Sequence, residues 1–312
     1  MYSIKHITTE GLAHIALHSP AQDSTALLCL AEGGRLRQFI FNDTTIIANE
    51  TSQGYAQNYA SAILFPFANR IKDGTYTYNN VQYVLDCNDI DNNNALHGFV
   101  YNKVFRCIDE SFDAEHASVT LEYDYDGRIE GFPFKFNIQL VYTLNKRGIK
   151  LSVTTVNTGN TSFPFTLGWH PYFTSSNLKQ SRLHFNSDIQ YTYDDQQILS
   201  GSVPLELDMP FQLDGMVLDD GYPLQSPSVG FTTPRYAMEM HCTSQENYLQ
   251  LYTPKQPVSI AIEPMTGAAN NFNNTIGLQQ LNPNQAYQTA WHITINTQHN
   301  HMNLLTHTLC NS

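Results

Sequence analysis

The sequence predicts an all-β protein, built as one domain in which large antiparallel sheets are stacked on each other. Apolar and polar residues alternate with a period of two in most segments, and most clearly in 119–125, 134–144 and 149–153. No amphipathic stretch reaches the length of about twelve residues that would predict a long helix, although 55–64 is expected to hold one or two helical turns. The alternation predicts strands that bury one face and expose the other.

A hairpin is the clearest local element. The segments 134–144 and 149–153 flank the turn residues Asn-Lys-Arg-Gly at 145–148, which is typical of two antiparallel strands joined by a tight turn. The Asn- and Asp-rich stretch 88–94 is predicted to be a loop. Three later segments repeat the alternation and are also predicted to be strands: 248–252, 258–262 and 287–295.

The chain shows no internal boundary. No low-complexity linker divides it, and no repeat of about 20 to 50 residues is visible, which argues against a propeller or a solenoid. Residues 1–312 are therefore predicted to form a single domain that ends in a polar tail from about residue 297. The tail carries three histidines and is expected to be disordered or loosely docked rather than a metal site: His299, His301 and His307.

Composition narrows the range of partners. The chain has 16 Lys and Arg residues against 28 Asp and Glu residues, and its net charge of -12 disfavours nucleic acid and anionic membranes. Its 5 cysteines are widely spaced and include no Cys-x-x-Cys, which predicts reduced thiols. No signal peptide and no membrane span is evident. We expect a cytoplasmic monomer or homodimer.

Four short motifs carry the residues that are competent for chemistry. Together they supply a cation, two imidazoles and a carboxylate, which suffice for concerted acid–base chemistry on a neutral polyol without a metal or a nucleophile. Phosphate-binding loops, dinucleotide fingerprints, zinc-protease motifs and nucleophile elbows are absent from the sequence. The motifs are Asn-Arg-Ile at 69–71, Leu-His-Gly-Phe at 96–99, Gly-Trp-His-Pro-Tyr-Phe at 168–173 and Ile-Glu-Pro at 262–264.

Glu263 and His170 are the candidates for proton transfer. Glu263 ends an apolar strand and precedes Pro264, so it is either a general base whose pKa is raised by partial burial or a strand-end carboxylate that faces solvent. His170 precedes Pro171 and is either a functional imidazole or a core histidine bonded to backbone carbonyls. Three aromatic neighbours are expected to wall a sugar ring beside it: Trp169, Tyr172 and Phe173.

Three further residues are candidates for binding. His97 follows a polar loop, and Gly98 after it permits close backbone approach. Arg70 either contacts hydroxyl or carboxylate groups of a ligand or forms a structural ion pair. Asp219, within 218–222, has the local sequence of a turn.

The order and wording of these motifs resemble those of the aldose 1-epimerase (galactose mutarotase-like) family. The resemblance covers roughly residues 30 to 295 and includes the blocks 65–74 and 218–222. It implies a β-supersandwich fold, which agrees with the period of two. It also implies an isomerase that interconverts the α and β anomers of a free aldose by opening and closing the sugar ring.

The family resemblance also implies residue roles. Glu263 would be the general base and His170 the general acid, with no cofactor and no metal. The remaining four residues would position the sugar, hold its hydroxyls or stabilise charge: Asn69, Arg70, His97 and Asp219.

Other functions stay open from the sequence. A hexose-6-phosphate 1-epimerase would need extra cations at the pocket mouth, for which Lys72 and Lys103 are the nearest in sequence. A non-catalytic carbohydrate-binding protein could share the fold, and a glycoside hydrolase would need a second catalytic carboxylate beside Glu263. The segment 196–203 lacks the Pro-Thr-Gly wording common in galactose mutarotases, and the chain is short for that branch, so galactose itself is not implied.

Overall fold

The computed structural model describes residues 1–48, 54–254 and 258–297. Strands dominate these residues, and the two α-helices, α1 (Tyr55–Asn58) and α2 (Asn271–Asn274), are single turns, as predicted for 55–64. The 3-10 segments are η1 (Lys72–Gly74), η2 (Val100–Asn102) and η3 (Leu178–Gln180). None of the described helices has the length and hydrophobicity needed to cross a bilayer. The predicted tail after residue 297, with its histidines and Cys310, lies outside the described residues; the four described cysteines are free thiols.

The larger sheet has eleven strands and runs in the order β1-β2-β3-β4-β5-β17-β26-β16-β6, with β25 pairing β26 and β22 pairing β25. It therefore combines the N-terminal strands with segments from the second half of the chain. Its strands are β1 (Ser3–Thr9), β2 (Leu12–His18), β3 (Thr25–Cys29), β4 (Arg35–Phe41), β5 (Thr44–Ala48), β6 (Ile63–Leu64), β16 (Gly168–Trp169), β17 (Tyr172–Thr174), β22 (Asp219–Pro223), β25 (Tyr248–Tyr252) and β26 (Ser259–Met265).

The second sheet has nine strands in the order β11-β12-β13-β14-β28-β24-β23-β18-β21. Its strands are β11 (Arg106–Phe112), β12 (His116–Tyr125), β13 (Phe136–Asn145), β14 (Gly148–Asn157), β18 (Arg182–His184), β21 (Phe211–Gln212), β23 (Ser228–Thr232), β24 (Tyr236–Cys242) and β28 (Ala286–Thr297). Four smaller antiparallel pairs complete the described fold: β7 (Arg70–Ile71) with β10 (Ala95–Leu96), β8 (Thr75–Tyr78) with β9 (Val81–Val84), β15 (Phe163–Phe165) with β27 (Gln279–Leu281), and β19 (Ile189–Tyr193) with β20 (Leu199–Pro204).

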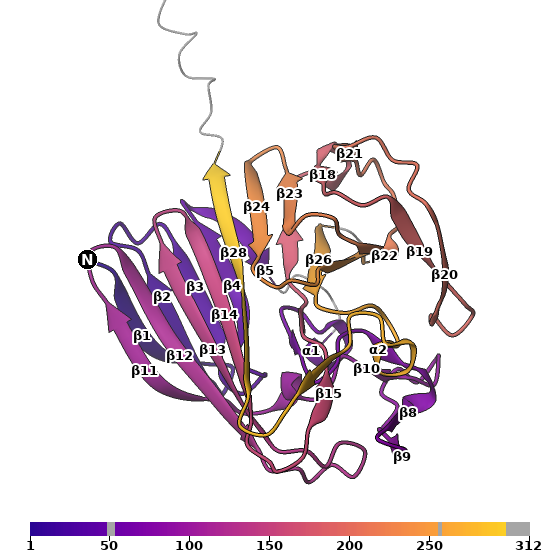
Figure 1. Cartoon of the computed structure of the whole chain (residues 1–312). Helices are drawn as coiled ribbons and strands as arrows, with labels where there is room; N and C mark the ends of the chain where they lie inside the picture. The colour runs from indigo at the N-terminus through magenta and orange to yellow at the C-terminus, as the bar shows by residue number, and fades with distance from the viewer. Residues whose placement is uncertain (49–53, 255–257, 298–312) are drawn as a thin grey trace, which may run out of the picture.

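The two large sheets form stacked layers. In Figure 1 the N-terminal strands β1 to β4 lie behind β11 to β14, while β22, β26 and the small pairs gather on the other side of the molecule. One large core cluster fills the interior and takes buried residues from both sheets, from Tyr2 to Ile295. This arrangement confirms the predicted all-β architecture.

The alternation of apolar and polar residues predicts the burial pattern of strands in the second sheet better than that of strands in the first. The predicted hairpin is β13 and β14, paired from Asn145 with Gly148, and β13 alternates strictly between buried and half-buried positions. By contrast, β26 is buried at every position, so the predicted wet face of 258–262 is wrong. One face of β26 joins the core through Ile260 and Ile262, and segments distant in sequence cover the other face.

Gly98 shows the close backbone approach expected from its motif. It has a left-handed φ of 68° and forms a parallel bridge with Phe65, whose carbonyl accepts the amide of Phe99 at 3.0 Å. A Cβ at position 98 would overlap the carbonyl oxygen and carbon of Phe65. The glycine therefore lets the loop that carries His97 lie directly against the strand region 63–65.

We expect Gly98→Ala to lower the free energy of unfolding clearly more than Gly11→Ala. Gly11 also has a left-handed φ, of 76°, but a Cβ there would meet no atom within 4 Å. The Gly11 variant thus measures the conformational penalty alone, about 1–2 kcal/mol, whereas the Gly98 variant adds a steric clash. Urea unfolding of both variants checks this, and equal losses would show that the contact with Phe65 yields without strain.

Candidate active site

The register of β26 builds the floor of a pocket. The segment 168–174 pairs with β26 on either side of Glu263, through β16 and β17, so the intervening His170 falls opposite Glu263. On the other side, Gln250 of β25 is the ladder partner of Glu263. Glu263 therefore lies between His170 and Gln250 inside a strand that continues to Met265, and not at a strand end.

A second row of the same sheet lies beside the first. Ala261 is paired with Tyr172 on one side and with Tyr252 on the other, and Tyr252 is paired with Asp219 of β22. Because residues two positions apart point to the same face of a strand, this row faces the pocket together with Glu263. Ala261 and Tyr172 belong to one small buried cluster, and Tyr252 packs against it.

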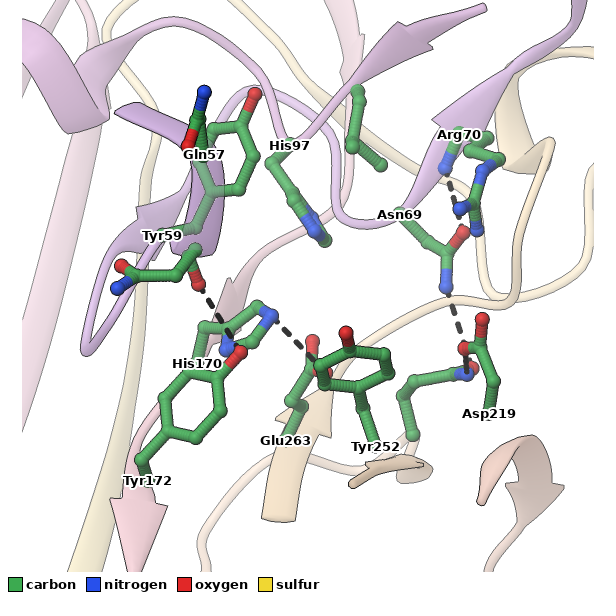
Figure 2. A pocket seen from close by; sticks show the side chains of 13 residues that line it. Gln57, Tyr59, Asn69, Arg70, His97, His170, Tyr172, Asp219, Tyr252 and Glu263 are labelled. Atoms are coloured by element: carbon green, nitrogen blue, oxygen red, sulfur yellow. Dashed lines mark hydrogen bonds and ion pairs between the residues drawn. The ribbon is translucent and has the colours of Figure 1, made fainter. Parts of the chain in front are cut away.

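The walls of the pocket come from the first third of the chain. The β7–β10 pair and the residues beside it contribute Asn69, Arg70, Leu96 and His97, and the α1 region contributes Gln57, Asn58 and Tyr59. The cavity has a volume of about 170 Å³ and opens to solvent. Figure 2 shows the His97 ring directed toward the space in front of His170 and Glu263.

The contact between His170 and Glu263 is the chemical centre of this pocket. His170 Nε2 lies 3.2 Å from Glu263 Oε1, and the two residues are 5% and 2% exposed. Glu263 Oε2 is buried without a hydrogen-bond partner among the described residues. Burial raises the pKa of Glu263 well above its ordinary value, with a further increase from Asp219, and lowers the pKa of His170 to about 4. Desolvation thus favours the uncharged form of both groups.

His97 is the second imidazole at the site. Its ring meets the His170 ring edge-on at a centroid distance of 5.2 Å and packs against Tyr59 at 5.0 Å. Burial, together with His170 and Arg70, holds the pKa of His97 well below its ordinary value. His97 Nδ1 has no partner among the described residues, so a neutral ring is available to a ligand.

Gln250 connects the binding candidates. Its Nε2 donates to Asp219 Oδ1 at 2.9 Å, while its Oε1 accepts from Asn69 Nδ2 at 3.3 Å and from Tyr193 Oη at 3.3 Å. A Cβ at Gly221 would overlap the Tyr193 hydroxyl, so this glycine makes room for the contact. The network fixes the amide of Asn69 and the carboxylate of Asp219 on one side of the pocket.

Arg70 has a structural partner as well as a place at the pocket. Its Nε lies 2.8 Å from Asp89 Oδ2 in the 88–94 loop, and its backbone amide donates to Asn69 Oδ1 at 2.8 Å. The ion-pair alternative is therefore confirmed, while the residue still lines the cavity. The interpretation of 218–222 as a turn is wrong, because Asp219 begins strand β22.

The aromatic wall differs from the prediction. Tyr172 lines the pocket and stacks on His170 at a centroid distance of 5.1 Å. Trp169 and Phe173 do not line it, because they point to the opposite face of the sheet, where Trp169 stacks on Trp291 in the core at 5.9 Å. The period of two along a strand predicts this difference, because Trp169 and Phe173 are an odd number of residues from His170 and Tyr172 is two residues from it.

Sequence reasoning also missed five lining residues. Gln250 and Tyr252 lie on the more polar face of the predicted strand 248–252, so the alternation pattern marks them. The pattern does not distinguish a strand face that meets solvent from one that lines a pocket. The other three belong to the short α1 region and carry no motif. The missed residues are Gln57, Asn58, Tyr59, Gln250 and Tyr252.

The pocket also gathers three metal-competent side chains. One donor atom from each of His97, His170 and Glu263 lies within 4.8 Å of the others, and all three residues are buried. Local sequence spacing contains no such set, because the fold brings the three together from segments far apart in the chain.

The stacked sheets and this pocket define a galactose mutarotase-like protein. A sequence profile of the family described as aldose 1-epimerase matches residues 21–294. The match covers most of the chain, and the protein therefore belongs to the aldose 1-epimerase family.

Individual relatives are distant in sequence and similar in structure. The uncharacterized protein YihR of Escherichia coli is 22% identical over 273 residues, which cover 84% of this chain and 87% of YihR. A galactose mutarotase-like protein from Clostridium acetobutylicum superposes with a TM-score of 0.85 at 20% identity, over 95% of this chain and 99% of that one. A galactose 1-epimerase from Lactobacillus acidophilus gives a TM-score of 0.80 at 17% identity, over 96% and 99%. These similarities establish the fold.

We expect Glu263→Gln to raise the melting temperature relative to wild type, by an amount that grows with pH. The folded-state pKa of Glu263 lies above its ordinary value of 4.5. Its contribution to stability is therefore fully present below that value and is lost as the pH rises through the folded-state pKa. Glutamine does not ionise, so the variant escapes this loss, which thermal unfolding from pH 4 to pH 8 measures.

Glu122→Gln is the matched control, because Glu122 is a buried glutamate outside the pocket. Its pairing with Arg106 lowers the pKa of Glu122, so its stabilisation is present above the ordinary value and is lost in acid. The two variants should therefore shift in opposite directions with pH. A melting temperature of Glu263→Gln that tracks wild type at every pH would contradict the raised pKa.

Proposed function

We propose that the protein is an aldose 1-epimerase that interconverts the α and β anomers of a free, uncharged aldose. One observation carries the proposal: the buried contact of 3.2 Å between His170 and Glu263 at the floor of an open pocket. A base and an acid held side by side suit a substrate that both gives and receives a proton. One carboxylate oxygen, Glu263 Oε2, has no partner among the described residues and is available to such a substrate.

The chemistry follows from two coupled proton transfers. Glu263 removes the proton of the anomeric hydroxyl while His170 protonates the ring oxygen, so the bond between C1 and the ring oxygen breaks and a carbonyl forms at C1. Rotation about C1–C2 presents the other carbonyl face, and reclosure returns both protons. Each group contributes about 10²–10⁴-fold to the rate.

The protonation states of Glu263 and His170 decide whether the pair can transfer protons to and from the sugar. Transfer requires a Glu263 carboxylate and a His170 imidazolium, which hold one proton between them. Arg70 favours this state because its charge lowers the pKa of Glu263. Ring opening then leaves Glu263 as a carboxylic acid and His170 as a neutral imidazole. Because burial favours these uncharged forms, it favours ring opening.

The charges around the pocket support an uncharged substrate. Among the described lining residues, Arg70 is the one lysine or arginine, and Asp89 already neutralises it, whereas Asp219 and Glu263 are acidic. The two lysines considered for a phosphate lie elsewhere: Lys72 faces Asp194 at 3.7 Å, and Lys103 lines a separate cavity. No second cation is placed to hold a sugar 6-phosphate in the described pocket.

Polarimetry on a panel of free aldoses tests the activity itself. We expect Glu263→Gln to lose at least nine tenths of wild-type kcat, since the loss of a general base is worth about 10²–10⁴-fold. His170→Asn should lower kcat much more than it raises KM, because the acid acts in the transition state.

Matched controls separate chemistry from folding. Glu122→Gln and His14→Asn change a buried glutamate and a buried histidine outside the pocket, and both should keep the wild-type rate. Wild-type kcat in folded Glu263→Gln would remove its role as the base. A protein that binds aldoses and catalyses no mutarotation would instead be a carbohydrate-binding member of the family.

We expect kcat/KM for glucose or galactose to exceed that for the matching 6-phosphate. The dianion meets acidic groups at the pocket and a net charge of -12 on the chain. The comparison is made at two salt concentrations, where screening should raise the phosphate rate. A phosphate preference of about tenfold, or roughly 1.4 kcal/mol, would move the protein to the sugar-phosphate epimerases.

A further inference from the structure

We propose that His97, His170 and Glu263 form a reversible binding site for a divalent transition-metal ion of the zinc class, and that the ion and the sugar exclude each other. The binding of the ion stands on the geometry of the three side chains, whereas the inhibition that follows rests on the proposed function.

The donor geometry matches such an ion. Two ligands of a tetrahedral zinc ion lie about 3.4 Å apart, given metal–ligand bonds of about 2.0–2.2 Å. His170 Nε2 and Glu263 Oε1 are already 3.2 Å apart, and one donor atom of His97 completes a set within 4.8 Å. Binding of the ion requires the His97 donor atom to move closer to the other two.

The donor chemistry and the surroundings also fit. Two imidazoles and one carboxylate form a ligand set that zinc uses in open sites, where a fourth position is left for water or substrate. The three residues are 6%, 5% and 2% exposed, and the pocket in front of them supplies the open position. Glu263 Oε2 and His97 Nδ1 have no partner among the described residues, so both retain free donor capacity.

Metal binding at this site should be reversible, because a histidine ligand lacks a hydrogen-bond partner that would hold its ring in place. Histidines that hold a resident metal usually donate their second ring N–H to a carboxylate or carbonyl, which orients the ring and strengthens the ligand. His170 faces Glu263 through its Nε2, and its Nδ1 is buried without such a partner among the described residues. We therefore infer a site that fills when zinc is supplied and empties in a chelator.

Exclusion of the sugar follows from shared atoms. The proposed acid and base are two of the three ligands, so a bound ion occupies Glu263 and His170 and leaves neither free for proton transfer. Zinc should then raise the apparent KM for the aldose and leave kcat at saturating sugar unchanged. EDTA alone should leave the rate unchanged, because no proposed step uses a metal.

Calorimetric titration of the metal-stripped full chain with zinc chloride tests the site without reference to activity. We expect one site whose affinity falls by about tenfold or more in His97→Asn and in Glu263→Gln, each verified as folded by circular dichroism. Magnesium, which prefers oxygen ligands, should bind to neither the wild type nor the variants at this site.

Two controls address other histidines. The double variant His241→Asn, His292→Asn removes a cross-strand imidazole pair outside the pocket. Replacement of the three tail histidines by Asn removes the histidine cluster near the end of the sequence. Both controls should bind zinc as the wild type does at the pocket site. Undiminished zinc affinity in His97→Asn and Glu263→Gln would overturn the site.

Competition with sugar completes the test. In a protein that catalyses mutarotation, a saturating aldose should weaken zinc binding, and unchanged zinc affinity would overturn the exclusion. If the wild type shows no mutarotation with any aldose, the proposed function fails while the titration of the variants still decides whether the metal site exists.

Discussion

The pocket depends on the register between β26 and its two neighbours. That register puts Glu263 between His170 and Gln250, in a strand buried at every position. A shift by one residue would turn Glu263 into the core and bring Ile262 to the pocket. The core therefore fixes the site, since the face of β26 that carries Ile260 and Ile262 cannot leave the interior.

Burial of this pair stores a stability penalty that a ligand can relieve. An unsatisfied buried acceptor costs about 1–3 kcal/mol, and Glu263 Oε2 has no hydrogen-bond partner in the described part of the chain. By contrast, Gln250 uses both ends of its amide on Asn69, Tyr193 and Asp219, so the binding side of the pocket is hydrogen-bonded before any sugar arrives. The site thus combines a binding wall that is already hydrogen-bonded with a proton-transfer centre where one carboxylate oxygen has no partner among the described residues.

Sequence reasoning reached the fold class and the main polar groups because both leave local traces. The β13–β14 hairpin follows from alternation around a turn, and the positions of Glu263, His170, His97 and Arg70 follow from their motifs. The features that sequence reasoning missed depend on contacts between residues that are far apart in the sequence. The second buried face of β26 is covered by residues from the first third of the chain. Trp169 was misplaced although the period of two assigns it to the face opposite His170.

The direction of the pKa shifts of Glu263 and His170 favours the ring-opening half of the proposed reaction. A solvated carboxylate would stay ionised at neutral pH, and its protonation would oppose ring opening. Here desolvation raises the pKa of Glu263 and lowers that of His170, so burial favours the uncharged arrangement of the shared proton, which is the one that ring opening produces. Arg70 and Asp219 act on that balance with opposite signs at Glu263, and the pairing of Arg70 with Asp89 moderates the first of these effects.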